Sequence, residues 1–105
     1  MKTIAERVAR GAALLDEKLP GWWQRIDLEA LTMRDTCMCI LGQLFGNEED
    51  RLEDDGYWQG LHDLNIPRFG AAHAAEYGFA DEDPFAYEAL DVEWCELIES
   101  RRAAS

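Results

Sequence analysis

Three cysteines and two histidines are the residues of this 105-residue chain that could hold a metal ion or act as a catalytic nucleophile and base. They are Cys37, Cys39, His62, His73 and Cys95. Zinc is held by thiolate and imidazole ligands, and two cysteines in a loop can share one ion. Cys37 and Cys39 instead fall in a segment with helical periodicity, where residues two apart point about 200° away from each other. Their thiolates would then diverge, so the spacing predicts no zinc site.

A catalytic cysteine would need a histidine beside it as base and a turn that presents its sulfur. No glycine-rich turn or oxyanion motif surrounds any of the three cysteines. Aspartate and glutamate are so numerous, 22 in all, that a pair of them carries little information, and residues 47–56 lack the ligand spacing of a calcium loop. We therefore predict no catalytic residue, no metal and no cofactor.

The cysteine segment is better explained as a central core helix over residues 37–45. Apolar side chains recur there at i, i+3, i+4, i+7 and i+8, namely Cys37, Ile40, Leu41, Leu44 and Phe45. Asp35 or Thr36 can cap the start of this helix. The register places Cys37 in the core and leaves Cys39 partly exposed.

Two long helices are predicted at the ends of the chain. The first begins at a capping box formed by Thr3 and Glu6 and ends before residues 20–21, a Pro-Gly pair. The last begins at Asp83 and Pro84 and continues past residue 100. Its apolar stripe is made of Tyr87, Leu90, Trp94, Leu97 and Ile98.

Shorter helices are predicted between these elements, over residues 27–33, 57–64 and 71–77. Gly78 is expected to cap the last of them, with Phe79 packed behind it. No repeat and no alternating strand pattern occurs. The sequence therefore predicts an all-α fold: a compact bundle in a single domain of residues 1–105, with two long terminal helices, a central core helix and short connecting helices. Trp58 and Trp94 are expected to anchor its core.

Charge is distributed unevenly along the chain. Residues 1–46 hold six Lys/Arg and six Asp/Glu, whereas residues 47–105 hold four and sixteen, so the second part carries the whole net charge of −12. Such a field repels nucleic acid and anionic membranes and favours basic partners. No apolar run reaches the roughly 18 residues of a membrane span. Three cysteines, an odd number without a secretion signal, indicate reduced thiols, so we expect a cytoplasmic protein.

A partner-binding surface is predicted at the adjacent tryptophans and in the acidic segment. Two neighbouring tryptophans cannot face the same way in regular structure, so one should enter the core while the other covers an edge or stays exposed. Aromatic residues are enriched at binding hot spots. The predicted partner-binding residues are Trp22, Trp23, Glu48, Glu49, Asp50, Asp54 and Asp55.

Several segments carry a resemblance to a known group. Their sequences are ALLDEKLPGWWQRIDLEAL, CMCILGQLFG, YWQGLHDLNI, EYGF and WCELIESRR, and their order spans most of the chain. In these the chain resembles small uncharacterised proteins of actinobacterial phages and prophages. The resemblance implies a small accessory protein in a bacterial cytoplasm that acts on host components. It implies no catalytic residue.

The function expected from these observations is that of a phage-type accessory protein that binds and modulates a host or phage protein without catalysis. One alternative is a nucleic-acid mimic whose carboxylates occupy the basic groove of a DNA-processing protein. Another is a small metalloprotein or enzyme centred on Cys37, Cys39 and a histidine.

Overall fold

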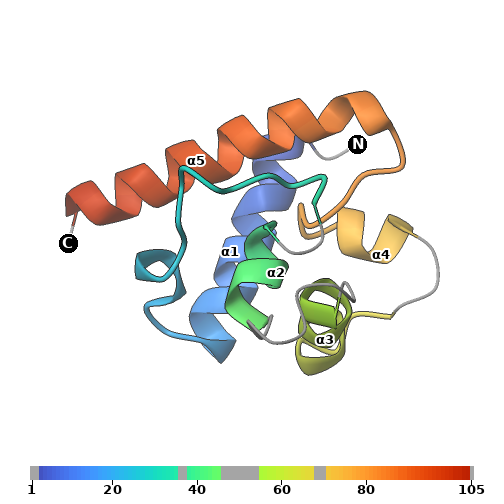
Figure 1. Cartoon of the computed structure of the whole chain (residues 1–105), viewed down its shortest axis with the longest axis horizontal. Coiled ribbons are helices and arrows are strands. Elements are labelled where there is room, and N and C mark those ends of the chain that lie inside the picture. The colour runs from blue at the N-terminus through green and yellow to red at the C-terminus, as the bar shows by residue number, and fades with distance from the viewer. Residues whose placement is uncertain (1–2, 36–37, 46–54, 68–70, 105) are drawn as a thin grey trace.

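The computed structural model describes residues 3–35, 38–45, 55–67 and 71–104 of the chain. Within these ranges every regular element is helical, which confirms the all-α prediction (Figure 1). The elements are α1 (Ile4–Lys18), η1 (Trp22–Gln24), α2 (Ile40–Phe45), α3 (Asp55–Asp63), α4 (Ala71–Ala75), η3 (Pro84–Ala86) and α5 (Tyr87–Ala104), where η marks a 3₁₀ turn. The radius of gyration, 12.5 Å, is close to the ~13 Å of a compact domain of this size.

Helix α1 begins and buries its residues as predicted. The Thr3 hydroxyl accepts a hydrogen bond of 3.1 Å from the Glu6 backbone N–H, which satisfies one of the free donors of the first turn. The side chains on the inner face are Val8, Ala12 and Leu15, all buried. One helical stripe therefore joins α1 to the core.

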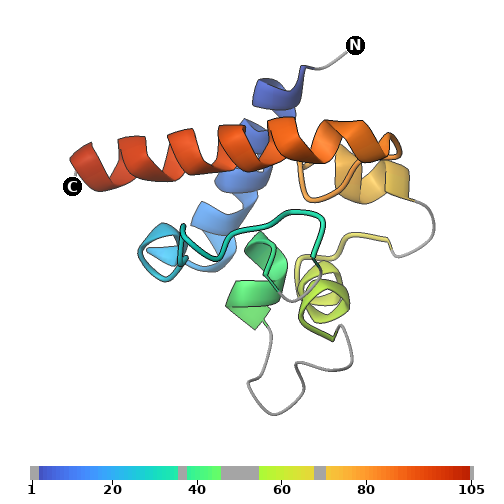
Figure 2. The same ribbon diagram turned by 45° about the horizontal axis from the view of Figure 1, so that its top comes forward.

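Helix α5 lies across one side of the molecule and crosses α1 (Figures 1 and 2). The Asp83 carboxylate accepts a hydrogen bond of 2.9 Å from the Phe85 N–H, and Pro84 begins η3, which leads directly into α5. The residues buried by α5 are Leu90, Trp94 and Ile98. The predicted start and stripe are therefore both confirmed.

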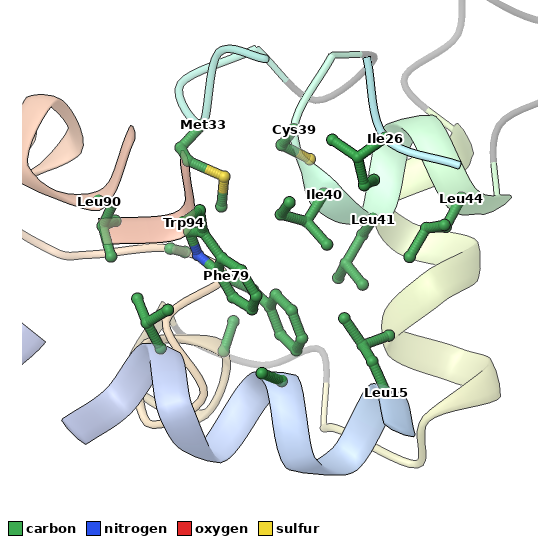
Figure 3. Close-up of a cluster of buried hydrophobic side chains, with 14 of the residues drawn as sticks. Leu15, Ile26, Met33, Cys39, Ile40, Leu41, Leu44, Phe79, Leu90 and Trp94 are labelled. Carbon is green, nitrogen blue, oxygen red and sulfur yellow. The ribbon is translucent and has the colours of Figure 1, made fainter. Parts of the chain in front are cut away.

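The centre of the core is an aromatic group around Trp94, which confirms the predicted role of this residue. The Trp94 ring stacks on Phe79 at 5.6 Å and meets Trp22 edge-on at 5.7 Å. Its indole N–H donates to the Gly78 carbonyl at 2.7 Å, so its one polar group is satisfied in the interior. Figure 3 shows the rings of Phe79 and Trp94 side by side, with Met33 and Leu90 beside the indole. The side chain of Trp58 lies outside the described residues.

The cysteine segment differs from the predicted helix. Helix α2 begins only at Ile40, and Met38 and Cys39 before it lie in a turn whose two N–H groups both donate to the Asp35 carbonyl, at 3.1 and 2.8 Å. Cys39 is buried, with 1% of its surface exposed, so its predicted partial exposure is wrong (Figure 3). Its Sγ accepts a hydrogen bond of 3.3 Å from the Gly42 N–H, as an N-cap side chain does. Cys37 lies outside the described residues.

The helix predicted over residues 27–33 does not form. The Asp27 carboxylate accepts from the Glu29 N–H at 3.1 Å, which makes a local turn. The side-chain amide of Gln43 then pairs with both backbone groups of Asp27, at 2.7 Å to the N–H and 3.2 Å to the carbonyl. Hydrogen bonds that a helix would have supplied are thus made by a residue of α2. Leu31 and Met33 are nevertheless buried.

The short helices end as their sequences predict. Gly78 adopts a left-handed conformation with φ of 71°, and the Phe79 N–H donates back to the Ala74 carbonyl at 3.1 Å. Asn65, with φ of 60°, ends α3 in the same way, since the Ile66 N–H donates to the carbonyl five residues earlier. Both ends have the hydrogen bonds of a Schellman motif. The turn at Gly78 directs Phe79 back into the core.

Candidate interaction surface

The two adjacent tryptophans face different environments, as expected. Trp22 is wholly buried, its ring packs on Trp94, and its indole N–H donates to the Asp16 carboxylate at 2.9 Å. Its predicted place in a partner-binding surface is therefore corrected: Trp22 is a core residue. Trp23 is half-buried against the core, and its carbonyl accepts a hydrogen bond of 3.0 Å from Arg102.

The predicted acidic contact residues fall almost entirely outside the described residues. These are Glu48, Glu49, Asp50 and Asp54. Asp55 is the first residue of α3, and its side chain is likewise outside the description. The position of these carboxylates relative to Trp23 therefore also lies outside the described part of the chain.

The residues with potential for metal or thiol chemistry lie apart. His62 and His73 are exposed, and within the described ranges no three His, Cys, Asp or Glu residues are placed to hold a metal ion. Burial raises the pKa of the Cys39 thiol to about 11, and burial also raises the pKa of the half-buried Cys95. At neutral pH both thiols are therefore protonated, and a thiol is a weak nucleophile.

Two large apolar side chains at the start of the last helix are exposed. Phe85 in η3 is 88% exposed and Val92 in α5 is 50% exposed. The seven residues from one to the other turn the chain by about 700° in α geometry, or about 740° if the first two steps are 3₁₀. Phe85 and Val92 therefore lie within about 20° of the same side of the helix axis and about 11 Å apart along it.

The side of α5 that carries these residues is turned away from the core. Val92 is two residues from both Leu90 and Trp94, which places it about 160° around the axis from each. We define the outer face of α5 as the exposed residues Phe85, Glu88, Ala89, Val92, Glu96 and Glu99, of which Phe85 lies in η3 just before the helix. An exposed phenylalanine and valine thus share one face with three glutamates.

The outer face lies in the most acidic described part of the chain. Residues 81–99 hold eight Asp/Glu and no Lys/Arg, which is a charge of −8 out of the total of −12. Three of these acids serve the fold: Asp81 pairs with Arg7 at 3.0 Å, Asp83 caps η3, and Asp91 accepts from the Met33 N–H at 2.6 Å. The other five form no ion pair with any described residue, and they are Glu82, Glu88, Glu93, Glu96 and Glu99.

Sequence reasoning missed Phe85 and Val92, although a signal for Val92 is present. The predicted apolar stripe of α5 contains its core residues, and Val92 lies on the opposite side of the helix. An apolar residue on that opposite side, such as Val92, is the signal. The sequence does not indicate that Phe85 is exposed. This residue follows Pro84 at a helix start, and residues beside a helix cap commonly pack against the helix.

Comparison of the chain with models of protein families, with curated protein sequences and with solved structures finds no match. The surface is therefore defined by this chain's own side chains. Among the described helices, none is both long and apolar enough to cross a membrane.

Proposed function

We propose that this protein binds another protein in the cytoplasm of a bacterial host and modulates its activity without catalysis, the partner being a host or phage protein with a basic or mixed apolar surface. The observation that carries this proposal is the exposure of Phe85 beside Val92 on one helix face. Covering a phenylalanine side chain is favourable by about 1.5–3 kcal/mol. Aromatic side chains of this kind are enriched at binding hot spots.

The charge around these two residues supports a basic partner. Eight acids without a base in residues 81–99 give a local field that attracts cationic surfaces and speeds their association. The resemblance to small proteins of actinobacterial phages and prophages supports the phage and host setting.

The same run of acids favours, as a second candidate, a nucleic-acid mimic that occupies the basic groove of a DNA-processing protein. Phe85 and Val92 count against it, because a mimic of a phosphate row has carboxylates where these apolar side chains stand. A Cys/His metalloprotein has no supporting observation in the described part of the chain.

The test begins with capture of partners on the immobilised full chain from a lysate of the bacterial host. Each protein recovered is then purified, and its binding is measured by calorimetry at several salt concentrations. We expect direct binding that weakens by less than about tenfold between roughly 0.05 and 0.5 M salt, because an apolar contact is not screened. A much steeper loss would favour the mimic, and failure of every purified candidate to bind would contradict a protein-binding function.

A further inference from the structure

We propose that the outer face of α5 docks a basic amphipathic helix of the partner, with apolar side chains opposite Phe85 and Val92 and lysines or arginines opposite Glu96 and Glu99. This inference rests on the proposed function and assigns it a surface and a recognition element.

The spacing of the outer face is that of a helix-packing seam. Five of its exposed residues follow one another at intervals of four, three, four and three, from Phe85 through Ala89, Val92 and Glu96 to Glu99, and Glu88 lies beside Ala89. Alternation of three and four keeps side chains on one stripe and lets a second helix pack along it. A partner helix can therefore follow this face for about two heptads.

The seam divides into an apolar half and an acidic half. Phe85, Ala89 and Val92 form the first half, with the Glu88 carboxylate along its edge, and the small Ala89 between the two larger side chains leaves room for a partner side chain to enter. Glu96 and Glu99 form the second half, with Glu93 at its side. An all-apolar helix would leave the two seam carboxylates covered and unpaired, which is costly. A helix with lysine or arginine at those positions satisfies both halves.

A second copy of the chain does not fit this face. In a parallel pair Glu96 would meet Glu96 and Glu99 would meet Glu99, so like charges would face each other. In an antiparallel pair centred on Val92, Phe85 would lie opposite Glu99. Either arrangement is unfavourable, since like charges repel and a covered carboxylate needs a partner.

Helix α5 is fixed to the rest of the fold by hydrogen bonds that do not involve the outer face. The Asp83 cap holds the start of η3, the Asp91 carboxylate holds the Met33 N–H, and two hydrogen bonds of 2.6 and 2.8 Å join Arg101 to Asp16 near the other end. None of these groups belongs to the outer face. Substitutions on the outer face can therefore test binding without removing an anchor of α5.

The test uses synthetic helical peptides of about 21 residues, or three heptads. Each peptide has leucine at the seam positions of one half and lysine at the seam positions of the other half. One peptide has the leucines in its N-terminal half and a second has them in its C-terminal half, so that both parallel and antiparallel docking are tested. Peptides with glutamate in place of lysine are the controls. Binding to the full chain is followed by calorimetry and by amide chemical shifts.

Two variants locate the contact. Val92→Glu introduces a charge into the apolar half, and Glu96→Lys/Glu99→Lys reverses the acidic half. The matched control is Glu17→Lys/Glu29→Lys, which changes the net charge equally at two exposed positions elsewhere. Circular dichroism confirms that each variant keeps its helices.

We expect one order of the lysine peptide to bind, with shifts concentrated in residues 85–99, and the glutamate peptides not to bind. Val92→Glu and the outer-face reversal should each weaken binding by about tenfold or more, and the control reversal by less than about threefold. Equal losses in the two reversals would show a general charge effect and overturn the docking site. So would failure of both lysine peptides to bind below about 1 mM. If a natural partner binds the Val92→Glu variant as tightly as the unchanged protein, the proposed function stands and the proposed docking surface is wrong.

Discussion

Arg101 and Asp16 join the last helix to the first through a pair of parallel hydrogen bonds, from Nη1 to Oδ1 at 2.6 Å and from Nη2 to Oδ2 at 2.8 Å. The same carboxylate accepts the indole N–H of Trp22. The hydrogen bond from Arg101 is the main reason that the pKa of Asp16 lies below its usual value of 3.8. One aspartate therefore links α1, α5 and the turn that holds Trp22.

Removal of this ion pair should have a modest, salt-dependent effect. The side chains are 33% and 41% exposed, so solvent screens them, and Arg101→Ala should lower the free energy of unfolding by about 1 kcal/mol. Arg101→Lys keeps the charge but loses the two-pronged geometry, so it should recover only part of the loss. Urea unfolding at low and high salt measures both. A larger loss at high salt than at low salt would contradict this account.

The same pair predicts the response to acid. Because the pKa of Asp16 is lower in the folded state, its contribution to stability is complete above pH 3.8 and is lost as the pH falls below that value through the lowered pKa. Asp16→Asn cannot titrate, so its stability should fall less steeply over this range than that of the unchanged protein. Parallel acid dependence in the two proteins would show that Asp16 does not contribute.

Gly11 should tolerate no side chain. A Cβ at this position would lie 2.0 Å from the Tyr77 carbonyl oxygen and 3.1 Å from the Trp94 ring. At an open helix position Gly→Ala adds about 1 kcal/mol of stability, but here we expect Gly11→Ala to cost about 3 kcal/mol or more because backbone must move. Ala13→Ser, on the exposed side of α1, is the control and should change stability by less than about 0.5 kcal/mol. Thermal and urea unfolding measure both, and a stabilised Gly11→Ala protein would contradict the close packing.

The two adjacent tryptophans should respond very differently to truncation. Trp22→Ala removes a fully buried ring and leaves the Asp16 carboxylate without its indole donor, so we expect a loss of about 3–5 kcal/mol. Trp23→Ala should cost about 1 kcal/mol, because Arg102 bonds to its backbone carbonyl rather than to its ring. Urea midpoints and slopes give both values. Equal losses would place both rings in the core.

Cys39 should be protected from thiol reagents in the folded protein. Single-cysteine variants that retain Cys39 or Cys95 separate the two thiols, and Cys95, which is half-buried, should react first. Labelling of Cys39 should need unfolding and therefore accelerate with added urea. Rapid labelling of Cys39 without denaturant would contradict its buried position.

Burial of the Cys39 thiol also predicts sensitivity to alkali. Its pKa is raised from 9.0 to about 11, so the folded state favours the protonated thiol, and the resulting stability is complete below pH 9 and lost as the pH rises towards 11. Between pH 8 and 10 the unchanged protein should lose about 1 kcal/mol more than Cys39→Ala does. The pKa of Tyr57, raised by burial from 10.0 to about 12, adds a further loss of stability that begins near pH 10 and grows towards pH 12. An identical pH dependence in the two proteins would contradict the raised pKa.

The terminal helices could be predicted from sequence because their signals are local. The Thr3 hydroxyl caps a backbone N–H three residues away, and the Asp83 carboxylate caps one two residues away. Gly78 likewise adopts its positive φ within the turn that it closes. Each depends only on neighbouring residues, so the pattern of residue types is sufficient.

The segment before α2 could not be predicted because distant residues decide it. Gln43 holds the backbone of Asp27 across 16 positions, and the Asp91 carboxylate takes the Met33 N–H across 58. These bonds replace the helical ones that the local pattern predicts. Cys39 is buried at the start of α2, where its Sγ accepts from the Gly42 N–H.

The surface was predictable in its charge and in the separation of the two tryptophans, but not in which residues are exposed. Acidity was evident from composition, but which of two adjacent tryptophans enters the core depends on the position of Asp16, six residues before Trp22. The exposure of Phe85 depends on the absence of any described element over that side of η3, which no local pattern reports.

The crossing of α1 by α5 also sets the order of events while the chain is being made. The inner face of α1 packs against α5, which is synthesised much later, since Ile98 follows Leu15 by 83 residues. At about 5–20 residues per second, ribosomes need roughly 4 to 17 s for that interval. During those seconds the apolar stripe of the first helix has no α5 to cover it. The packing of α5 against α1 therefore forms only after this interval.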